Sequence, residues 1–288
     1  MSEGEDFITM RLGEGKECFL FVLLTSYVVL FCPATGLGDL GSAMGTGAKL
    51  KKSKWSVTAT VLAMSNAYEW QSQDHEGSGK LSLSLMRGGD KMDVYAVASM
   101  IQQFGGFDEY HISNAVLGVK TKSKKVIGTA KLTHGFSVTL PTYKKQYDES
   151  SYRGGIAYVP TVSYQKGRWA ASVAAQAQKN WHLYDRSSQG IGNIEYSAAE
   201  SLSLAYKFSK RWEMELSFEY ISGVSYQGSF HSQYSAGQSM AFAPDSNTKV
   251  AIGLSSGGNA LDASGSRNTI KWYDQYSAQY YGAISKRF

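Results

Sequence analysis

The chain has 288 residues, of which 43% are hydrophobic, 13% aromatic and 18% charged, and its formal net charge is +5. The aromatic content excludes a disordered chain, and a mean hydropathy of −0.28 excludes a bundle of membrane helices. Two cysteines cannot form the disulfide framework of a small secreted scaffold.

The N-terminal region contains an uncharged apolar run, Cys18–Cys32, with Arg11 and Lys16 before it and small residues up to Gly36 after it. A membrane helix needs about 20 residues, so this shorter run with a basic front is typical of a secretory signal peptide. The sequence predicts a signal peptide over 1–36, with an uncleaved anchor as the alternative. Because the first nine residues are acidic, Met10 is an alternative start.

Removal of residues 1–36 would leave 27 basic and 19 acidic residues, a net charge of +8, and no cysteine. The mature chain is therefore not expected to use disulfides, zinc–thiolate sites or a cysteine nucleophile.

The remaining sequence shows alternation of apolar and polar residues with period two, which indicates strands with one apolar face. The clearest example is Trp212–Tyr220, where Trp212, Met214 and Leu216 alternate with glutamates and a serine. Segment 126–140 repeats the pattern. Runs of this kind predict twelve strands, at roughly 54–69, 79–87, 91–104, 110–122, 125–140, 154–165, 168–184, 194–208, 211–226, 234–243, 248–257 and 268–288.

The connections between these runs alternate in length. Five have the chemistry of tight turns, at Arg87–Asp90, Lys122–Lys125, Gln165–Arg168, Ser209–Arg211 and Pro244–Asn247. Others, such as 71–78, 141–153 and 185–193, are long and polar. Short turns at one end and long loops at the other predict an all-β fold, a transmembrane antiparallel up-and-down β-barrel over 54–288, preceded by a periplasmic segment over 37–53.

The tryptophans fall near the predicted strand ends. Trp169 and Trp181, in one strand, are separated by roughly 28 Å, which approximates the ~25 Å apolar band of outer-membrane barrels. The sequence therefore predicts aromatic girdles, formed by Trp55, Trp169 and Trp212 at the short-turn end and by Trp70, Trp181 and Trp272 at the long-loop end.

The last strand places Tyr280, Ile284 and Phe288 on one face. It resembles the terminal-Phe strand that the barrel assembly machinery of Gram-negative outer membranes recognises, although Lys286 departs from the usual apolar residue. Residues 54–288 resemble outer-membrane β-barrels in general.

A narrower resemblance is to the channel-like barrels grouped with phenol meta-pathway degradation genes. It rests on Gly135–Thr142, Val159–Tyr164 and Trp212–Glu219. The resemblance implies a bacterial outer-membrane location, passage of small solutes, and contact with outer-membrane lipids and lipopolysaccharide.

The polar faces of the strands are expected to line the lumen. The predicted pore-lining charges are Asp93, Lys120, Lys131, Lys207, Glu213, Glu215, Glu219, Lys271 and Arg287. The row of three glutamates beside Lys207 has two interpretations: one wall of a charged constriction that selects ions, or a salt-bridge network that closes the lumen.

A catalytic alternative rests on Tyr110–Ala115, in which His111 and Ser113 resemble the His-x-Ser-Asn element of outer-membrane phospholipase A and the lipid A deacylases. On a regular strand both side chains would share the lipid-facing side with Ala115 and Leu117. Residues 115–145 contain no Asp, Glu, Asn or Gln that would orient the histidine.

The sequence favours a channel that passes small polar or ionic solutes through a charged lumen and that is not an enzyme. The alternatives are a lipid-modifying hydrolase and a structural or adhesive barrel with binding loops. The histidines lack metal-ligand spacing, no nucleotide motif is present, and the lysines at 120–125 fit a solvated turn, so neither a cofactor nor a nucleic-acid partner is expected.

Overall fold

The computed structural model describes residues 55–67, 76–104, 110–261, 268–271, 273 and 277–288. The predicted signal peptide (1–36) and periplasmic segment (37–53) lie outside the described residues. No helix in the described ranges is long and apolar enough to cross a membrane.

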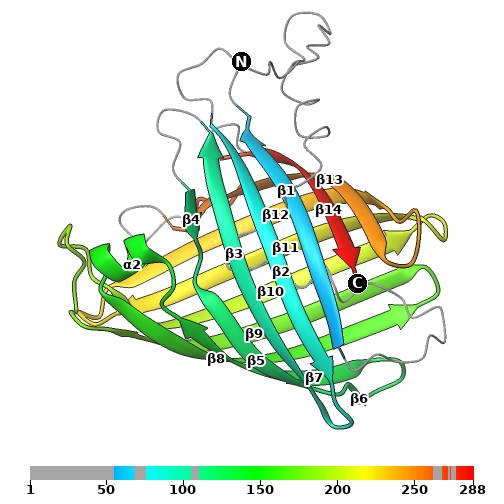
Figure 1. Cartoon of the computed structure of the whole chain (residues 1–288), viewed down its shortest axis with the longest axis horizontal. Helices are drawn as coiled ribbons and strands as arrows, with labels where there is room; N and C mark the ends of the chain where they lie inside the picture. Colours follow the sequence, from blue (N-terminus) through cyan, green and yellow to red (C-terminus); the bar gives the residue numbers. More distant parts are fainter. Residues whose placement is uncertain (1–54, 68–75, 105–109, 262–267, 272, 274–276) are drawn as a thin grey trace, which may run out of the picture.

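The strands form one closed antiparallel barrel of twelve strands (Figure 1). The fourth barrel strand consists of three segments, β4 to β6, and every other strand is a single element. The first half contains β1 (Trp55–Asn66), β2 (Gly77–Gly88), β3 (Met92–Phe104), β4 (Tyr110–Ile112), β5 (Ala115–Thr121), β6 (Lys124–Lys125), β7 (Lys131–Leu140) and β8 (Tyr152–Lys166). The second half contains β9 (Trp169–His182), β10 (Ile194–Lys207), β11 (Trp212–Ser225), β12 (Phe230–Phe242), β13 (Thr248–Asn259) and β14 (Gln279–Arg287).

Strand β14 closes the barrel by pairing with β1, with Val61 opposite Ile284. The Phe288 N–H donates to the Val57 carbonyl, and the Phe288 carbonyl accepts from the Val57 N–H, so the C-terminus lies beside the start of β1. Closure satisfies the backbone groups of what would otherwise be edge strands.

The two faces of the wall follow from strand β11. Trp212 and Met214 are 45% and 37% exposed, whereas Glu219 and Ser225 are 5% and 2% exposed. Since side chains alternate along a strand and register partners share a side, β11 defines an outward-facing and an inward-facing set of residues for the whole barrel. The outward-facing set contains exposed apolar side chains on many strands, among them Leu83, Val94, Leu117, Phe136, Ile156, Val173 and Ile252.

The connections confirm the predicted sorting of turns. The β2–β3, β8–β9, β10–β11 and β12–β13 connections are short and lie at one end, with Gly167 at φ 60° in the β8–β9 turn. The other end holds the longer loops, including the one with helix α2 (Lys144–Glu149). One connection at that end, Tyr226–Ser229 between β11 and β12, is a tight turn and is shorter than the sequence predicts.

The tight turn predicted at Lys122–Lys125 is wrong. Lys124 and Lys125 form β6, which pairs with the start of β7, and the chain reverses between Val126 and Ala130 instead. Gly128, at φ 57°, supplies the left-handed conformation that this reversal needs.

The strand predicted over 268–288 begins only at Gln279. The preceding described residues form local bonds: the Thr269 hydroxyl donates to the Asn259 carbonyl at 2.6 Å, and the Ile270 N–H donates to the Asn268 side chain at 2.8 Å. Such side-chain bonds compete with strand pairing, so this segment is a loop.

The β12–β13 turn is held by Asp245. Its carboxylate accepts the backbone N–H groups of Asn247 and Thr248, each at 2.7 Å, and these bonds lower the pKa of Asp245 below its ordinary value. A depressed carboxyl pKa stabilises the fold above the unfolded-state pKa of about 4, and this contribution is lost as the pH falls through the folded-state value.

Asp245→Ala should therefore lower the thermal midpoint of the barrel at neutral pH by a small amount. The difference from wild type should shrink as the pH is lowered below about 4. Thermal scans of both proteins in detergent between pH 2 and 7 test this, and a difference that does not vary with pH would contradict it.

Candidate functional site

The inward-facing wall contains a ladder of carboxamides on β9. The Gln176 amide donates to the Gln178 oxygen at 2.7 Å, and the Gln178 amide donates to the Asn180 oxygen at 2.6 Å. The three side chains are two residues apart, so they point to the same side of the strand. They form one continuous polar strip along the lumen.

A row of small and polar residues crosses the wall from β3 to β10. Direct register pairs link its members, which are Tyr95, Gly118, Ser137, Ala157, Gln178 and Ser197. The Tyr95 ring lies against Gly118, where an added Cβ would be 2.3 Å from the Tyr95 Cζ. The glycine therefore makes room for the tyrosine to lie along the wall.

A cluster of charges lies at the short-turn end of the lumen. The Glu213 carboxylate is 2.9 Å from the Lys249 amine and 3.9 Å from the Lys207 amine. These side chains line a cavity of about 160 Å³ between the β10–β11 and β12–β13 turns. One carboxylate therefore faces two ammonium groups, and the cluster has a net positive charge.

The other two glutamates of β11 have different surroundings. Glu215 accepts a hydrogen bond from the Ser203 hydroxyl at 2.7 Å. Glu219 is 5% exposed and lies opposite Ser201 and Ser235, and no ion pair to it is seen among the described residues. Glu219 is thus the most buried acid of the lumen.

The structure also shows two inward-facing lysines that the sequence prediction missed. Lys249 pairs with Glu213, and Lys80 on β2 is 1% exposed. Lys80 precedes the apolar residues Leu81 and Leu83, and Lys249 precedes Val250. The period-two pattern therefore indicates an inward position for both lysines.

The remaining predicted lumen charges lie apart from the three glutamates. Asp93 is opposite Lys120 and forms an ion pair with Lys122. Lys131 is opposite Ser163, and Arg287 is opposite Thr58.

Lys271 does not lie on a strand of the barrel wall. It lies in the loop before β14, and its N–H donates to the hydroxyl of Tyr234, whose register partner Tyr220 belongs to the outward-facing set. The strand that was expected to carry Lys271 on its inward-facing side does not form at this position.

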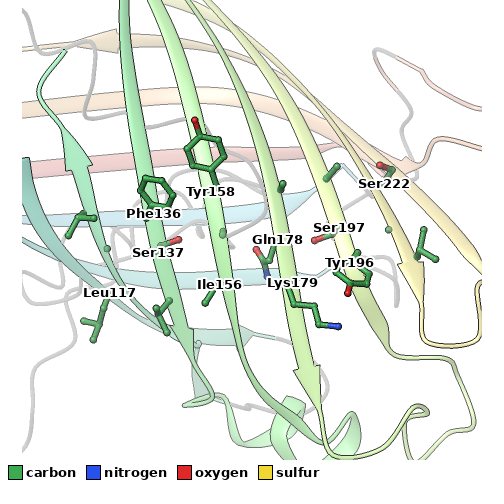
Figure 2. Close-up of a pocket in the computed structure, with 18 of the residues that line it drawn as sticks. Leu117, Phe136, Ser137, Ile156, Tyr158, Gln178, Lys179, Tyr196, Ser197 and Ser222 are labelled. Atoms are coloured by element: carbon green, nitrogen blue, oxygen red, sulfur yellow. The ribbon is translucent and has the colours of Figure 1, made fainter. Parts of the chain in front are cut away.

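The outer wall has an apolar hollow of about 870 Å³ over strands β3 to β11 (Figure 2). Outward-facing side chains such as Leu117, Phe136 and Ile156 line it, together with five residues of the row described above, Gly118, Ser137, Ala157, Gln178 and Ser197. At its border the Lys179 amine lies 4.2 Å from the Tyr196 ring centroid and forms an ion pair with Glu195. Glu200, four residues beyond Tyr196 on β10, also faces outward and is exposed.

The tryptophans that the structure describes are exposed on the outer surface. Trp55, Trp169 and Trp212 lie at the short-turn end, and Trp181 lies near the long-loop end of β9. Tyr280, Ile284 and Phe288 are likewise exposed on the outside of β14. Trp70 and Trp272 lie outside the described residues.

The arrangement expected for His111 and Ser113 is wrong. His111 pairs with Ile101, and the Ser113 N–H donates to the Ser99 carbonyl, so both residues share the inward-facing register rather than that of Leu117. The cause is an extra residue between β4 and β5, which reverses the alternation. The His111 ring stacks on Tyr143, with centroids 4.7 Å apart.

Ser113→Ala should consequently leave lipid hydrolysis unchanged. We expect no calcium-dependent release of fatty acid from phospholipid or lipid A by either the wild type or the variant, because the serine does not face the bilayer. Fatty-acid release by the wild type that the variant abolishes would contradict this expectation and revive the hydrolase.

No metal-binding cluster of three or more His, Cys, Asp or Glu side chains occurs in the described part of the chain.

No family model and no curated protein sequence matches the chain. Solved structures do: the COG4313 outer membrane channel from Pseudomonas putida F1 has a TM-score of 0.61 at 12% identity, over 87% of this chain and 100% of that chain. The KdgM porin and the NanC porin each have a TM-score of 0.50 at 10% identity, over 81% of this chain and 99% and 98% of theirs. The chain has the fold of an outer-membrane channel.

Proposed function

We propose that the protein is a channel of the bacterial outer membrane that passes small polar or ionic solutes through the lumen of its barrel. The supporting observation is the division of a closed barrel into an apolar outer surface and an inner wall of serines, carboxamides and charged groups. A closed barrel satisfies its backbone in lipid, and a polar inner wall stabilises water and solutes inside it.

The charges of the lumen support the constriction over the closed network. Glu213 is paired with two lysines, but Glu215, which is only partly buried, accepts a serine hydroxyl and has no ion pair among the described residues. A network that closes a dry lumen would need a partner for each charge, because an unpaired buried charge is costly. Water in the lumen removes this requirement, and the fixed charges then act on ions that pass.

Planar bilayers and liposomes test the channel directly. Insertion of the purified protein should produce discrete conductance steps in KCl, and liposomes that contain it should swell in small neutral and ionic solutes. Properly folded protein that produces neither steps nor swelling would overturn the proposal. Failure to partition into detergent or outer membranes would also contradict the assignment of the location.

The outer surface suggests the other partners. Outward-facing apolar side chains and exposed tryptophans would contact outer-membrane lipids and lipopolysaccharide, with acyl chains filling the hollow beside Lys179. The exposed aromatic and aliphatic residues of β14, with Phe288 at the end, fit a signal for the barrel assembly machinery. We propose no cofactor, no catalytic activity and no nucleic-acid partner.

A further inference from the structure

One row of the inner wall contains no charged side chain. It is the row Tyr95, Gly118, Ser137, Ala157, Gln178 and Ser197, which crosses the wall on consecutive strands. Consecutive strands are about 4.8 Å apart, so the row covers roughly 24 Å of the lumen wall. An ion that loses water at this level meets no opposite charge in the row to replace its hydration.

The groups that the row does contain are neutral hydrogen-bonding groups. Gln178 is the centre of the carboxamide ladder, which continues to Gln176 on one side and Asn180 on the other. Each carboxamide both donates and accepts, and the serine hydroxyls of the neighbouring strands do the same. Because the ladder bonds fix the amide orientations, the donors and acceptors are held in place before a solute arrives.

An aromatic ring lies at the other end of the row. Tyr95 packs against Gly118, with its Cζ and hydroxyl 2.3 Å and 2.4 Å from the position of an added Cβ. The same arrangement occurs on β14, where the Tyr281 ring lies against Gly253. The short side chains of Ser137 and Ala157 separate the Tyr95 ring from the carboxamides.

This combination matches one class of solute. A sugar or polyol has many hydroxyls that both donate and accept, and it has C–H faces that pack on the face of an aromatic ring. An ion gains nothing from the uncharged row, and an apolar solute would leave the donors and acceptors that the ladder does not use without partners.

We infer that the row from Tyr95 to Ser197, with the Gln176–Gln178–Asn180 ladder, is a binding site in the lumen for neutral hydroxyl-rich solutes, namely sugars and polyols. The inference rests on the proposed function, because it requires an open lumen. Such a site makes sugars and polyols pass faster than neutral solutes of the same size that have few hydroxyls.

Liposome swelling with two solutes of similar size tests the site. Glucose has five hydroxyls, and triethylene glycol has two, so a size filter treats the pair almost alike. Wild-type protein should pass glucose in preference to the glycol. Gln178→Met keeps the length of the side chain but removes the amide, so it should reduce the glucose rate about 2- to 10-fold, the effect of one lost hydrogen bond.

The glycol rate and the KCl conductance of Gln178→Met should stay at wild-type levels, and this retained conductance shows that the variant is folded. Gln176→Met, one step along the ladder, provides a second variant with the same expected effect. Gln238→Met is the matched control, because Gln238 lies opposite Leu216 on the outward-facing side and is exposed. It should change neither rate.

Two results would overturn the inference, and they are distinguishable. Normal KCl conductance with no preference for glucose, or with equal loss of both rates in Gln178→Met, would remove the sugar site and leave the channel intact. Absence of both conductance and swelling in the wild type would remove the channel and the site together.

Discussion

Leu202→Arg is expected to destabilise the barrel in a bilayer by about 2–4 kcal/mol, the cost of a basic side chain on the lipid face near the membrane centre. Leu202 is 41% exposed on the outside and lies in the middle of β10. The guanidinium would be transferred from water into the region that acyl chains occupy. Reversible urea unfolding of wild type and variant in phospholipid vesicles, followed by tryptophan fluorescence, measures the difference.

The neighbouring residue supplies the control. Ser201 lies one position away at the same depth but faces the lumen, opposite Glu219. Ser201→Arg should therefore cost much less stability, while its bulk should reduce single-channel conductance. Equal loss of stability in the two variants would contradict the assignment of the two faces, and with it the membrane-spanning barrel.

The sequence predicted the barrel because its signal is local and repeated. Alternation as in Trp212–Tyr220 sets both the strand and its lipid-facing side, and twelve such runs with sorted turns leave few other folds. The same alternation indicates that Lys80 and Lys249 face inward, although the predicted set of lumen charges did not include them. The strands and their lipid-facing sides can therefore be predicted without knowledge of which strands pair.

The errors have a different origin, since they depend on single residues that change the register. One extra residue after Ser113 moves His111 and Ser113 to the inward-facing side, although the sequence around them reads as a regular strand. At the β13–β14 loop, side-chain bonds of Asn268 and Thr269 stop a strand that composition favours. Neither effect has a periodic signature.

The ion pairs of the lumen were also beyond the sequence. Glu213 and Lys249 are 36 residues apart and lie on β11 and β13, which are separated by β12. The residue of β12 opposite Glu213 is Ala241, whose partner on β13 is Ala251, two residues from Lys249. The short alanine leaves room for the lysine to reach diagonally across β12. Such a contact depends on three side chains in three strands, so charge pairing could not be assigned before the register was known.

Removal of these lumen charges should have the second large effect. Glu213→Gln leaves Lys249 and Lys207 facing the short-turn mouth without their acid, which makes the mouth more positive. A unit charge roughly 8 Å from a passing ion changes its energy by about 0.5–2 kcal/mol at effective dielectric constants between 80 and 20. The cation permeability should therefore fall about 2- to 30-fold and the anion permeability should rise, so the cation-to-anion permeability ratio falls.

Reversal potentials across a bilayer with a KCl gradient measure this ratio. The triple variant Glu213→Gln, Glu215→Gln, Glu219→Gln should shift the potential further in the same direction, and high salt should weaken both shifts by screening. Glu200→Gln is the matched control, because Glu200 is a glutamate of the neighbouring strand β10 that faces outward. Unchanged conductance and reversal potential in the triple variant would reject the charged constriction, whereas a shift in Glu200→Gln as large as that in Glu213→Gln would show that surface charge rather than the lumen sets selectivity.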